Sequence, residues 1–466
     1  MQTGRVRGTA RRTGGVLAAL LVVLMVAGCA SVAGVAEPVT AGSVLVGDGV
    51  DPTFVQGTDG GTTDRIAAST ISDVQAFWRQ NFPTVFNKPW RDLTGGVYSV
   101  DTAADKGKAP PCTDNASDLE GNAFYCPAKD SVAWDRAALL PVLRDQFGDA
   151  AVVVVLAHEM GHSVQARTSP TADMERADPD RYPTILIETM ADCYSGAFVR
   201  SVVDGKAPHL RMTPPQLDKA ISALAAFRDP VGTGADEAGA HGDAFDRVSA
   251  FQDGYQQGPK LCAGMTVDNR QFTQRSFTNL GDEQRGGNLA LADLVKAIEP
   301  DLNVYFGQLA GAKWSQPKLT QTDGAASCPG GDQGPVAFCA DTKSVLLSTK
   351  GTIPALVSSI GDYAAGTLLA TRYALAALSA LGKPVDGPTA EKAAVCLAGA
   401  YTASVPSRSK GGTVSLSPGD LDKAVGVLLS YDYGSRDTAG KAISTGFDRV
   451  LAFRAGFSGG SKACGV

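Results

Sequence analysis

The sequence predicts a mainly α-helical protein, α+β at most with short strands, in which one helical domain occurs twice in tandem. The first observation is a long apolar segment, AAVVVVLAHEMGHSVQAR at residues 150–167, which continues well beyond the usual length of a strand. Its valine run alone favours extended chain, because β-branched residues suit strands. The second observation favours a helix: the corresponding later segment, LLATRYALAALSAL, has the alanine and leucine content of one.

Residues 1–28 are predicted to be a lipoprotein signal peptide. Four arginines precede the apolar run VLAALLVVLMVAG, which ends just before Cys29. This run is shorter than the roughly 20 apolar residues of a membrane span and fits the apolar region of a signal peptide. Val26 to Cys29 look like a bacterial lipobox, in which Cys29 becomes the lipidated N-terminus. A simple secretory signal is the alternative, and the arginine pair at 11 and 12 leaves Sec or twin-arginine export open.

Acyl chains on Cys29 would anchor the exported chain to the cell membrane, on the extracytoplasmic face of a bacterium. Residues 29–63 are poor in large apolar side chains and are predicted to form a flexible tether. The roughly 400 residues that follow are too many for one core and suit two domains. The net charge is −6 and no long basic run follows the signal, so we expect no nucleic acid partner.

Blocks of sequence in the first half recur in the same order in the second half. DVQAFWRQNFPTVF at 73–86 corresponds to DLVKAIEPDLNVYF at 293–306, and LDKAISAL and FDRVSAF recur as LDKAVGVL and FDRVLAF. Shared composition does not explain such an order, so the sequence predicts a duplicated domain. We expect a first copy at 64–264, a linker at 265–284 and a second copy at 285–466.

The cysteines indicate disulfide bonds. Nine occur, and setting aside Cys29 leaves an even number, as expected for an exported chain. The alignment of the two copies matches Cys112 with Cys328, Cys126 with Cys339, Cys193 with Cys396 and Cys262 with Cys464. Four cysteines in each copy allow three connectivities, and the sequence does not choose among them. Local spacing favours Cys112–Cys126 and Cys328–Cys339, which leaves Cys193–Cys262 and Cys396–Cys464.

The segment HEMGH at residues 158–162 predicts a metal site. On a helix, His158 and His162 lie one turn apart on the same face, so both imidazoles can bind one ion. Glu159 lies beside them, where its carboxylate can accept a proton from a water molecule that the ion activates for attack on a carbonyl. Catalytic zinc usually takes three protein ligands. A third histidine at the metzincin spacing is excluded, because that position holds Thr168.

Glu188, in the segment ETMADC, is the better candidate for the third ligand, and we expect it on the next helix. Asp192 lies one turn further along the same face. There it can accept a hydrogen bond from the free ring nitrogen of a ligand histidine and fix its tautomer. The simpler interpretation of Asp192 is a buried helix carboxylate.

The first copy resembles the bacterial neutral zinc metallopeptidase family over about residues 73–262. The resemblance rests on FYCPA, HEMGHSVQ, ETMADC and HGDAFDRVSAF, which occur here in the family's order. It implies a zincin-like helical domain that hydrolyses peptide bonds, with one Zn²⁺ ion on His158, His162 and Glu188 and with Glu159 as the general base. It also implies that His241, at the family's HG position, stabilises the tetrahedral intermediate. A capping or core histidine is the alternative interpretation of His241.

The second copy lacks the residues of the predicted site. Thr371, Arg372 and Leu375 stand where the first copy has the two histidines and the glutamate of HEMGH. Val395 faces Asp192 and Ile443 faces His241, although Glu391 matches Glu188. We therefore expect a degenerate, pseudo-enzyme copy without a metal.

The sequence as a whole predicts a lipid-anchored zinc metallopeptidase that acts on a peptide or protein substrate. We expect the second copy to pack against the first or to recruit a partner, such as another envelope protein. The alternative is a non-catalytic binding or scaffold lipoprotein at the cell surface that holds a structural metal. A structural zinc normally has four protein ligands, whereas three are evident here, which favours catalysis.

Overall fold

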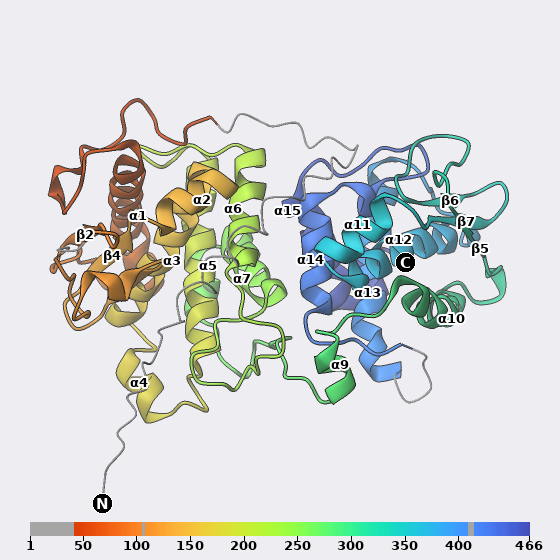
Figure 1. Cartoon of the computed structure of the whole chain (residues 1–466). Coiled ribbons are helices and arrows are strands. Elements are labelled where there is room, and N and C mark those ends of the chain that lie inside the picture. The colour runs from red at the N-terminus through yellow and green to blue at the C-terminus, as the bar shows by residue number, and fades with distance from the viewer. Residues whose placement is uncertain (1–41, 105–107, 409–413) are drawn as a thin grey trace, which may run out of the picture. The chain divides into compact units, whose positions relative to one another are not determined.

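The computed structural model describes residues 42–104, 108–408 and 414–466 (Figure 1). The predicted signal peptide, Cys29 and the beginning of the predicted tether lie outside the described residues. The described chain is mainly helical with two small mixed sheets, which confirms the mainly helical prediction. Within the described ranges, none of the helices combines the length and the apolar composition of a membrane span.

The first half surrounds a small sheet with helices. Its helices are α1 (Thr62–Phe86), α2 (Leu139–Phe147), α3 (Asp149–Arg167), α4 (Ala172–Ala177), α5 (Thr184–Val203), α6 (Pro214–Ala226), α7 (Ala244–Gln257) and α8 (Pro259–Ala263). Its strands are β1 (Val55–Gln56), β2 (Val97–Val100), β3 (Ala123–Cys126) and β4 (Ser131–Asp135), with short 3-10 helices η2 (Pro52–Phe54) and η3 (Ala116–Leu119). The strand order is β1-β2-β4-β3, with β3 antiparallel to β4 and the other pairs parallel, so β3 forms an edge of this sheet.

Helix α3 lies at the centre of the first half's core. It packs against α1, α2, α5 and α6. Val152, Val153 and Val154 are fully buried, and so are Leu156 and Met160 further along the helix. A valine run that suits a strand is helical here because most of its side chains are buried between neighbouring helices, and burial outweighs the small difference in intrinsic propensity.

The part of the predicted tether that the structure describes, residues 42–63, is folded rather than flexible. Val44 and Val55 are buried, and β1 joins the sheet by parallel pairing of Val55 with Val97. The low apolar content of this segment predicted a tether, but two valines and a short strand pairing are sufficient to dock it onto the domain.

Among the described residues, the second half contains similar elements in a similar order, but no strand there corresponds to β1 and no helix corresponds to α4. Its helices are α9 (Leu280–Gln284), α10 (Leu291–Ala310), α11 (Thr352–Ser359), α12 (Asp362–Ala380), α13 (Gly387–Arg408), α14 (Asp420–Ser430) and α15 (Gly446–Ala463). Its strands are β5 (Lys318–Thr322), β6 (Val336–Cys339) and β7 (Ser344–Ser348), with η4 (Gly311–Lys313) and η5 (Tyr433–Ser435). The sheet order β5-β7-β6, with β6 antiparallel to β7 and β5 parallel to it, repeats the arrangement of β2, β4 and β3.

Close helix crossings also correspond between the halves. Helix α7 crosses α5 so closely that a Cβ on Gly254 would lie 1.7 Å from the carbonyl oxygen of Cys193. Helix α15 crosses α13 in the same way, because a Cβ on Gly456 would lie 1.7 Å from the carbonyl oxygen of Cys396. Glycine is required at both crossings, since no side chain fits between the two backbones.

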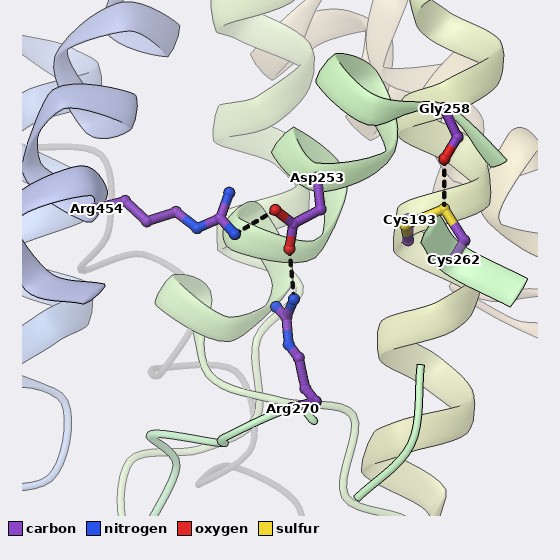
Figure 2. Close-up of a disulfide and its surroundings, with 6 residues drawn as sticks. All are labelled: Cys193, Asp253, Gly258, Cys262, Arg270 and Arg454. Atoms are coloured by element: carbon purple, nitrogen blue, oxygen red, sulfur yellow. Dashed lines mark hydrogen bonds and ion pairs between the residues drawn. A yellow bond between two sulfur atoms is a disulfide. The ribbon is translucent and has the colours of Figure 1, made fainter. Parts of the chain in front are cut away.

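The described residues form four disulfides: Cys112–Cys126, Cys193–Cys262, Cys328–Cys339 and Cys396–Cys464. These are the pairs that local spacing favours. Figure 2 shows the bond that joins Cys193 on α5 to Cys262 on α8. Disulfides of this number are typical of proteins that fold in an oxidising compartment, so the protein is extracytoplasmic.

Candidate metal centre

Helix α3 carries HEMGH near the middle of its length, where the helix is buried. His158 is buried and His162 is partly exposed, and their ring centroids lie 4.9 Å apart in an edge-to-face arrangement. The glycine of the motif has a packing role, because a Cβ on Gly161 would lie 2.8 Å from Cα of Ala191 on α5. This close approach brings α5 next to the two histidines.

Glu188 on α5 faces both imidazoles. Its Oε2 lies 3.1 Å from Nε2 of His158, and its Oε1 lies 3.5 Å from Nε2 of His162. One donor atom from each of the three residues lies within 4.8 Å of the others, and no second group of this kind occurs in the part of the chain that the structure describes. The structure therefore brings together the three residues that the sequence predicted as ligands.

The spacing of these donor atoms fits a zinc ion. Zn–N and Zn–O bonds of roughly 2.0–2.1 Å in a tetrahedron place neighbouring ligand atoms about 3.3 Å apart. The distances from the two Glu188 oxygens to the imidazole nitrogens, 3.1 and 3.5 Å, lie on either side of this value, and all three donor atoms lie within 4.8 Å of one another. Two imidazole nitrogens and a carboxylate oxygen are also a usual donor set of catalytic zinc sites.

Asp192, one turn after Glu188, fixes the orientation of the first imidazole. Its Oδ1 accepts a hydrogen bond from Nδ1 of His158 at 2.7 Å, which leaves Nε2 of that ring facing Glu188. Asp192 is fully buried, and Arg247 on α7 donates to both of its oxygens, at 2.9 and 3.0 Å. Arg247 also donates to the carbonyl oxygen of Phe227 at 2.6 Å. The orientation of His158 thus depends on three elements: α3, α5 and α7.

Gln165 orients the second imidazole. Its Oε1 lies 2.8 Å from Nδ1 of His162, and its Nε2 donates to the carbonyl oxygen of Ile187 at 2.7 Å. Both candidate ligand histidines therefore have the outer ring nitrogen occupied by an acceptor oxygen, as is usual in metal sites.

Glu159 lies next to the ligands and against strand β3. It is 9% exposed, and its Oε2 accepts a hydrogen bond from the backbone N–H of Tyr125 at 3.1 Å. Burial raises the pKa of Glu159 above its ordinary value. A carboxylate with a raised pKa is a stronger base, so it retains a proton that it accepts from water.

The charges of the site stabilise one another in the metal-free chain. Burial lowers the pKa of His158, but Asp192 and Glu188 outweigh burial and raise it to about 10. Burial raises the pKa of Glu188, but His162 and His158 outweigh it and hold the pKa well below the ordinary range. A metal ion that binds here therefore replaces protons on the imidazoles.

His241 lies in the same cleft but outside this hydrogen-bonded group. The cleft has a volume of about 570 Å³ and is lined by the three candidate ligands, Glu159, β3 residues and His241. The side chain of His241 is 51% exposed, with Nδ1 3.5 Å from Oδ1 of Asp229. Its backbone N–H donates to Oδ2 of the same aspartate at 2.7 Å.

Three parts of this centre were not assigned from the sequence: Arg247, Gln165 and the backbone N–H of Tyr125. All three lie within the quoted motifs FDRV, HEMGHSVQ and FYCPA. The motifs were a usable signal that these residues belong to the site. Their roles depend on which helices and strands meet, which the sequence does not state.

In the second half, the place that corresponds to the site is filled. Arg372, aligned with Glu159, is fully buried and donates to the carbonyl oxygens of Val336 at 2.9 Å and Gln333 at 3.2 Å, and also to those of Tyr433 and Arg436. Burial lowers the pKa of Arg372 to about 9. Four main-chain oxygens thus surround a guanidinium group where the first half has its acidic and imidazole groups.

A family model described as "Putative neutral zinc metallopeptidase" matches residues 3–264, more than half of the chain. The chain belongs to this family. The match contains all the residues of the metal centre, from Tyr125 to Arg247, and does not extend into the second half. Neither the comparison with curated proteins nor that with solved structures gave a match.

Proposed function

We propose that the protein is a zinc-dependent peptidase. Its active site lies in the first half of the chain and hydrolyses peptide bonds of a substrate. The observation that carries the proposal is the convergence of His158, His162 and Glu188, with the buried carboxylate of Glu159 beside them. Three ligands, rather than four, leave a coordination position for water or substrate, as in catalytic zinc sites.

The residues of the cleft have distinct roles in this reaction. Zinc, when bound, supplies a Lewis acid that polarises the substrate carbonyl and makes water more acidic. Glu159 accepts the proton of the attacking water and returns it to the leaving amine. His241 lies at the mouth of the cleft, where its imidazole can donate a hydrogen bond to the oxygen of the tetrahedral intermediate.

The cleft suits an extended peptide. Strand β3 forms one edge of the sheet and lines the cleft with Ala123, Phe124 and Tyr125. A peptide in extended conformation can pair with main-chain groups of such an edge other than the N–H of Tyr125, which Glu159 holds, and so lie across the candidate ligands.

We further propose that the second half is a degenerate tandem copy of the first. The shared succession of elements, the corresponding disulfides and the corresponding glycine crossings support this proposal. The buried guanidinium of Arg372 leaves no donor set for a metal there. Anchoring by a lipid on Cys29, and recruitment of an envelope protein by the second copy, remain proposals from the sequence.

The variant Glu159→Gln tests the proposed function. We expect the purified variant to retain zinc, because Glu159 is not a ligand, and to lose hydrolysis of a casein or mixed-peptide substrate by a factor of roughly 10²–10⁴. Zinc retention with unchanged hydrolysis would contradict the role of Glu159. A wild-type chain that binds zinc but hydrolyses none of the peptides would favour the alternative, a binding or scaffold protein with a structural metal.

A further inference from the structure

The two halves contact each other through corresponding helices. Helices α6 and α7 of the first half pack against α14 and α15 of the second. Asp218 of the first LDKA segment and Asp422 of the second are corresponding residues, as are Phe245 and Phe447 of the two FDRV segments.

These corresponding residues make reciprocal contacts. Asp218 accepts hydrogen bonds from the backbone N–H groups of Gly446 and Phe447, at 2.6 and 2.8 Å, at the beginning of α15. Asp422 accepts one from the backbone N–H of Phe245, at 3.3 Å, at the beginning of α7. Each half thus supplies an acceptor for the N-terminus of a helix in the other half, as in an isologous dimer interface.

The aromatic side chains repeat this symmetry. The ring of Phe245 lies 4.8 Å from that of Phe457, and the ring of Phe447 lies 4.8 Å from that of Tyr255, the residue that corresponds to Phe457. A further contact joins the halves through Asp253, which accepts from Arg454 of the second half and from Arg270 at 2.6 Å (Figure 2).

The two aspartates differ in what lies behind the helix that each one holds. Helix α15, held by Asp218, carries Arg449, which donates to the carbonyl oxygens of Leu428 and Ile443. Helix α7, held by Asp422, carries Arg247, which holds Asp192 and through it His158. The contact made by Asp422 is therefore connected to the candidate ligand His158. The corresponding contact made by Asp218 is connected only to main-chain carbonyl groups.

Asp422 reaches the centre by a second connection. Its Oδ2 lies 3.4 Å from Nε of Arg228, which directly follows Phe227, the acceptor of Arg247. The next residue, Asp229, accepts from the backbone N–H of His241. Asp422 thus contacts both segments that hold Arg247, the beginning of α7 and the residues after α6.

We propose that Asp422 is a positioning residue for the metal centre, so that the second half completes the support of a site to which it contributes no ligand. This inference rests on the proposed function, because it takes His158 as a zinc ligand. Asp422 acts through Arg247 and Asp192, one step further from the metal than residues that hydrogen-bond a ligand. Loss of the latter typically weakens metal binding by roughly 10–100-fold, so we expect a smaller factor of about 3–10 for Asp422.

The experiment compares Asp422→Ala with Asp218→Ala, and Asp422→Asn with Asp218→Asn, in the full mature chain. The Asp218 variants are matched controls, because they remove the corresponding contact at the same interface. Three quantities are measured: the zinc dissociation constant by competition with a chelator, the visible absorption spectrum of the Co²⁺-substituted chain, and the midpoint of thermal unfolding.

We expect all four variants to unfold at lower temperature, whereas only the Asp422 variants bind zinc about 3–10-fold more weakly and change the Co²⁺ spectrum. The asparagine variant keeps an acceptor for Phe245 and should show the smaller change. The proposal would be overturned if the Asp422 variants kept the wild-type zinc affinity and Co²⁺ spectrum. It would also be overturned if the Asp422 and Asp218 variants lost zinc affinity by the same factor.

Asp422→Asn preserves the shape of the side chain and carries the comparison if Asp422→Ala does not fold. Failure of the proposed function gives a different result, because the wild-type chain itself would then bind no zinc or hydrolyse no peptide. Failure of this inference alone leaves the wild-type zinc binding and hydrolysis intact.

Discussion

Among single residues, Asp192 is the position outside the candidate ligands at which we expect a substitution to affect zinc binding most. It is fully buried between the guanidinium group of Arg247 and the candidate ligand His158. We expect Asp192→Asn to weaken zinc binding by roughly 10–100-fold, since the amide cannot hold both His158 and Arg247 as the carboxylate does. The measurement is zinc affinity by chelator competition. Asp135→Asn is the control, because Asp135 is an equally buried carboxylate whose partners, Thr102, Gly121 and the turn before α2, include no candidate ligand. An unchanged affinity in the Asp192 variant would contradict the role given to this carboxylate.

The imidazoles of the metal-free chain predict proton release on metal binding. The pKa of His158 is raised to about 10, against the opposing effect of burial, and that of His162 is raised in the same way by Glu188. Both rings must be neutral to bind zinc, so we expect about one to two protons to be released per zinc at pH 7. Titration calorimetry in buffers of different ionisation enthalpy measures this number. A binding enthalpy independent of the buffer would contradict the predicted charge state.

At the scale of elements, the contact between α3 and α5 determines whether the ligands meet. A Cβ on Gly161 would lie 2.8 Å from Cα of Ala191, so Gly161→Ala must push the two helices apart. We expect a loss of about 1–3 kcal/mol in the free energy of unfolding, together with weaker zinc binding, because Glu188 moves away with α5.

Gly456→Ala is the matched control for the Gly161 variant. Its Cβ would lie 1.7 Å from the carbonyl oxygen of Cys396 in the second half, so we expect a loss of stability at least as large as that of Gly161→Ala. The ligands do not lie on those helices, and zinc affinity should change less than in Gly161→Ala. Denaturant unfolding and chelator competition measure both quantities, and equal zinc affinities in the two variants would contradict the argument.

At the scale of the whole molecule, buried carboxyl groups at the interface between the halves predict a dependence of stability on pH. Burial raises the pKa of Asp243 to about 8, that of Asp422 to about 7 and that of Asp246 to about 6. Between the ordinary pKa of an aspartate and these raised values, the folded chain keeps protons that the unfolded chain has already lost. Folding therefore binds protons over this pH range. The free energy of unfolding should fall as pH rises from about 5 to about 8.

Denaturant unfolding of the metal-free chain at several pH values tests this dependence. The raised pKa of His158 acts in the same direction, because its stabilising contribution is also lost as pH rises. The lowered pKa values of Glu188 and Asp192 act below this range and do not change the sign within it. Asp422→Asn should make the dependence shallower, and a stability that rises between about pH 5 and 8 would contradict the assignment of these buried protons.

The sequence was most informative where chemistry demands a fixed spacing. HEMGH requires two histidines four residues apart, so His158 and His162 were predictable, and the buried helix followed from the length of the apolar segment. The partners of these residues depend on contacts between distant segments. Arg247 lies 55 residues from Asp192, and Asp422 lies 177 residues from Phe245. No local pattern encodes such contacts, and the docking of Val44 and Val55 was missed for the same reason.

The central claim, that His158, His162 and Glu188 hold one ion, is tested most directly by the metal content of the purified protein. Elemental analysis after dialysis should find about one zinc per wild-type chain and much less in Glu188→Ala, since two histidines alone rarely retain zinc. The variant Glu391→Ala, at the corresponding position of the second half, should retain the wild-type content. A wild-type chain without metal, or a Glu188→Ala chain that keeps its full zinc, would contradict the claim.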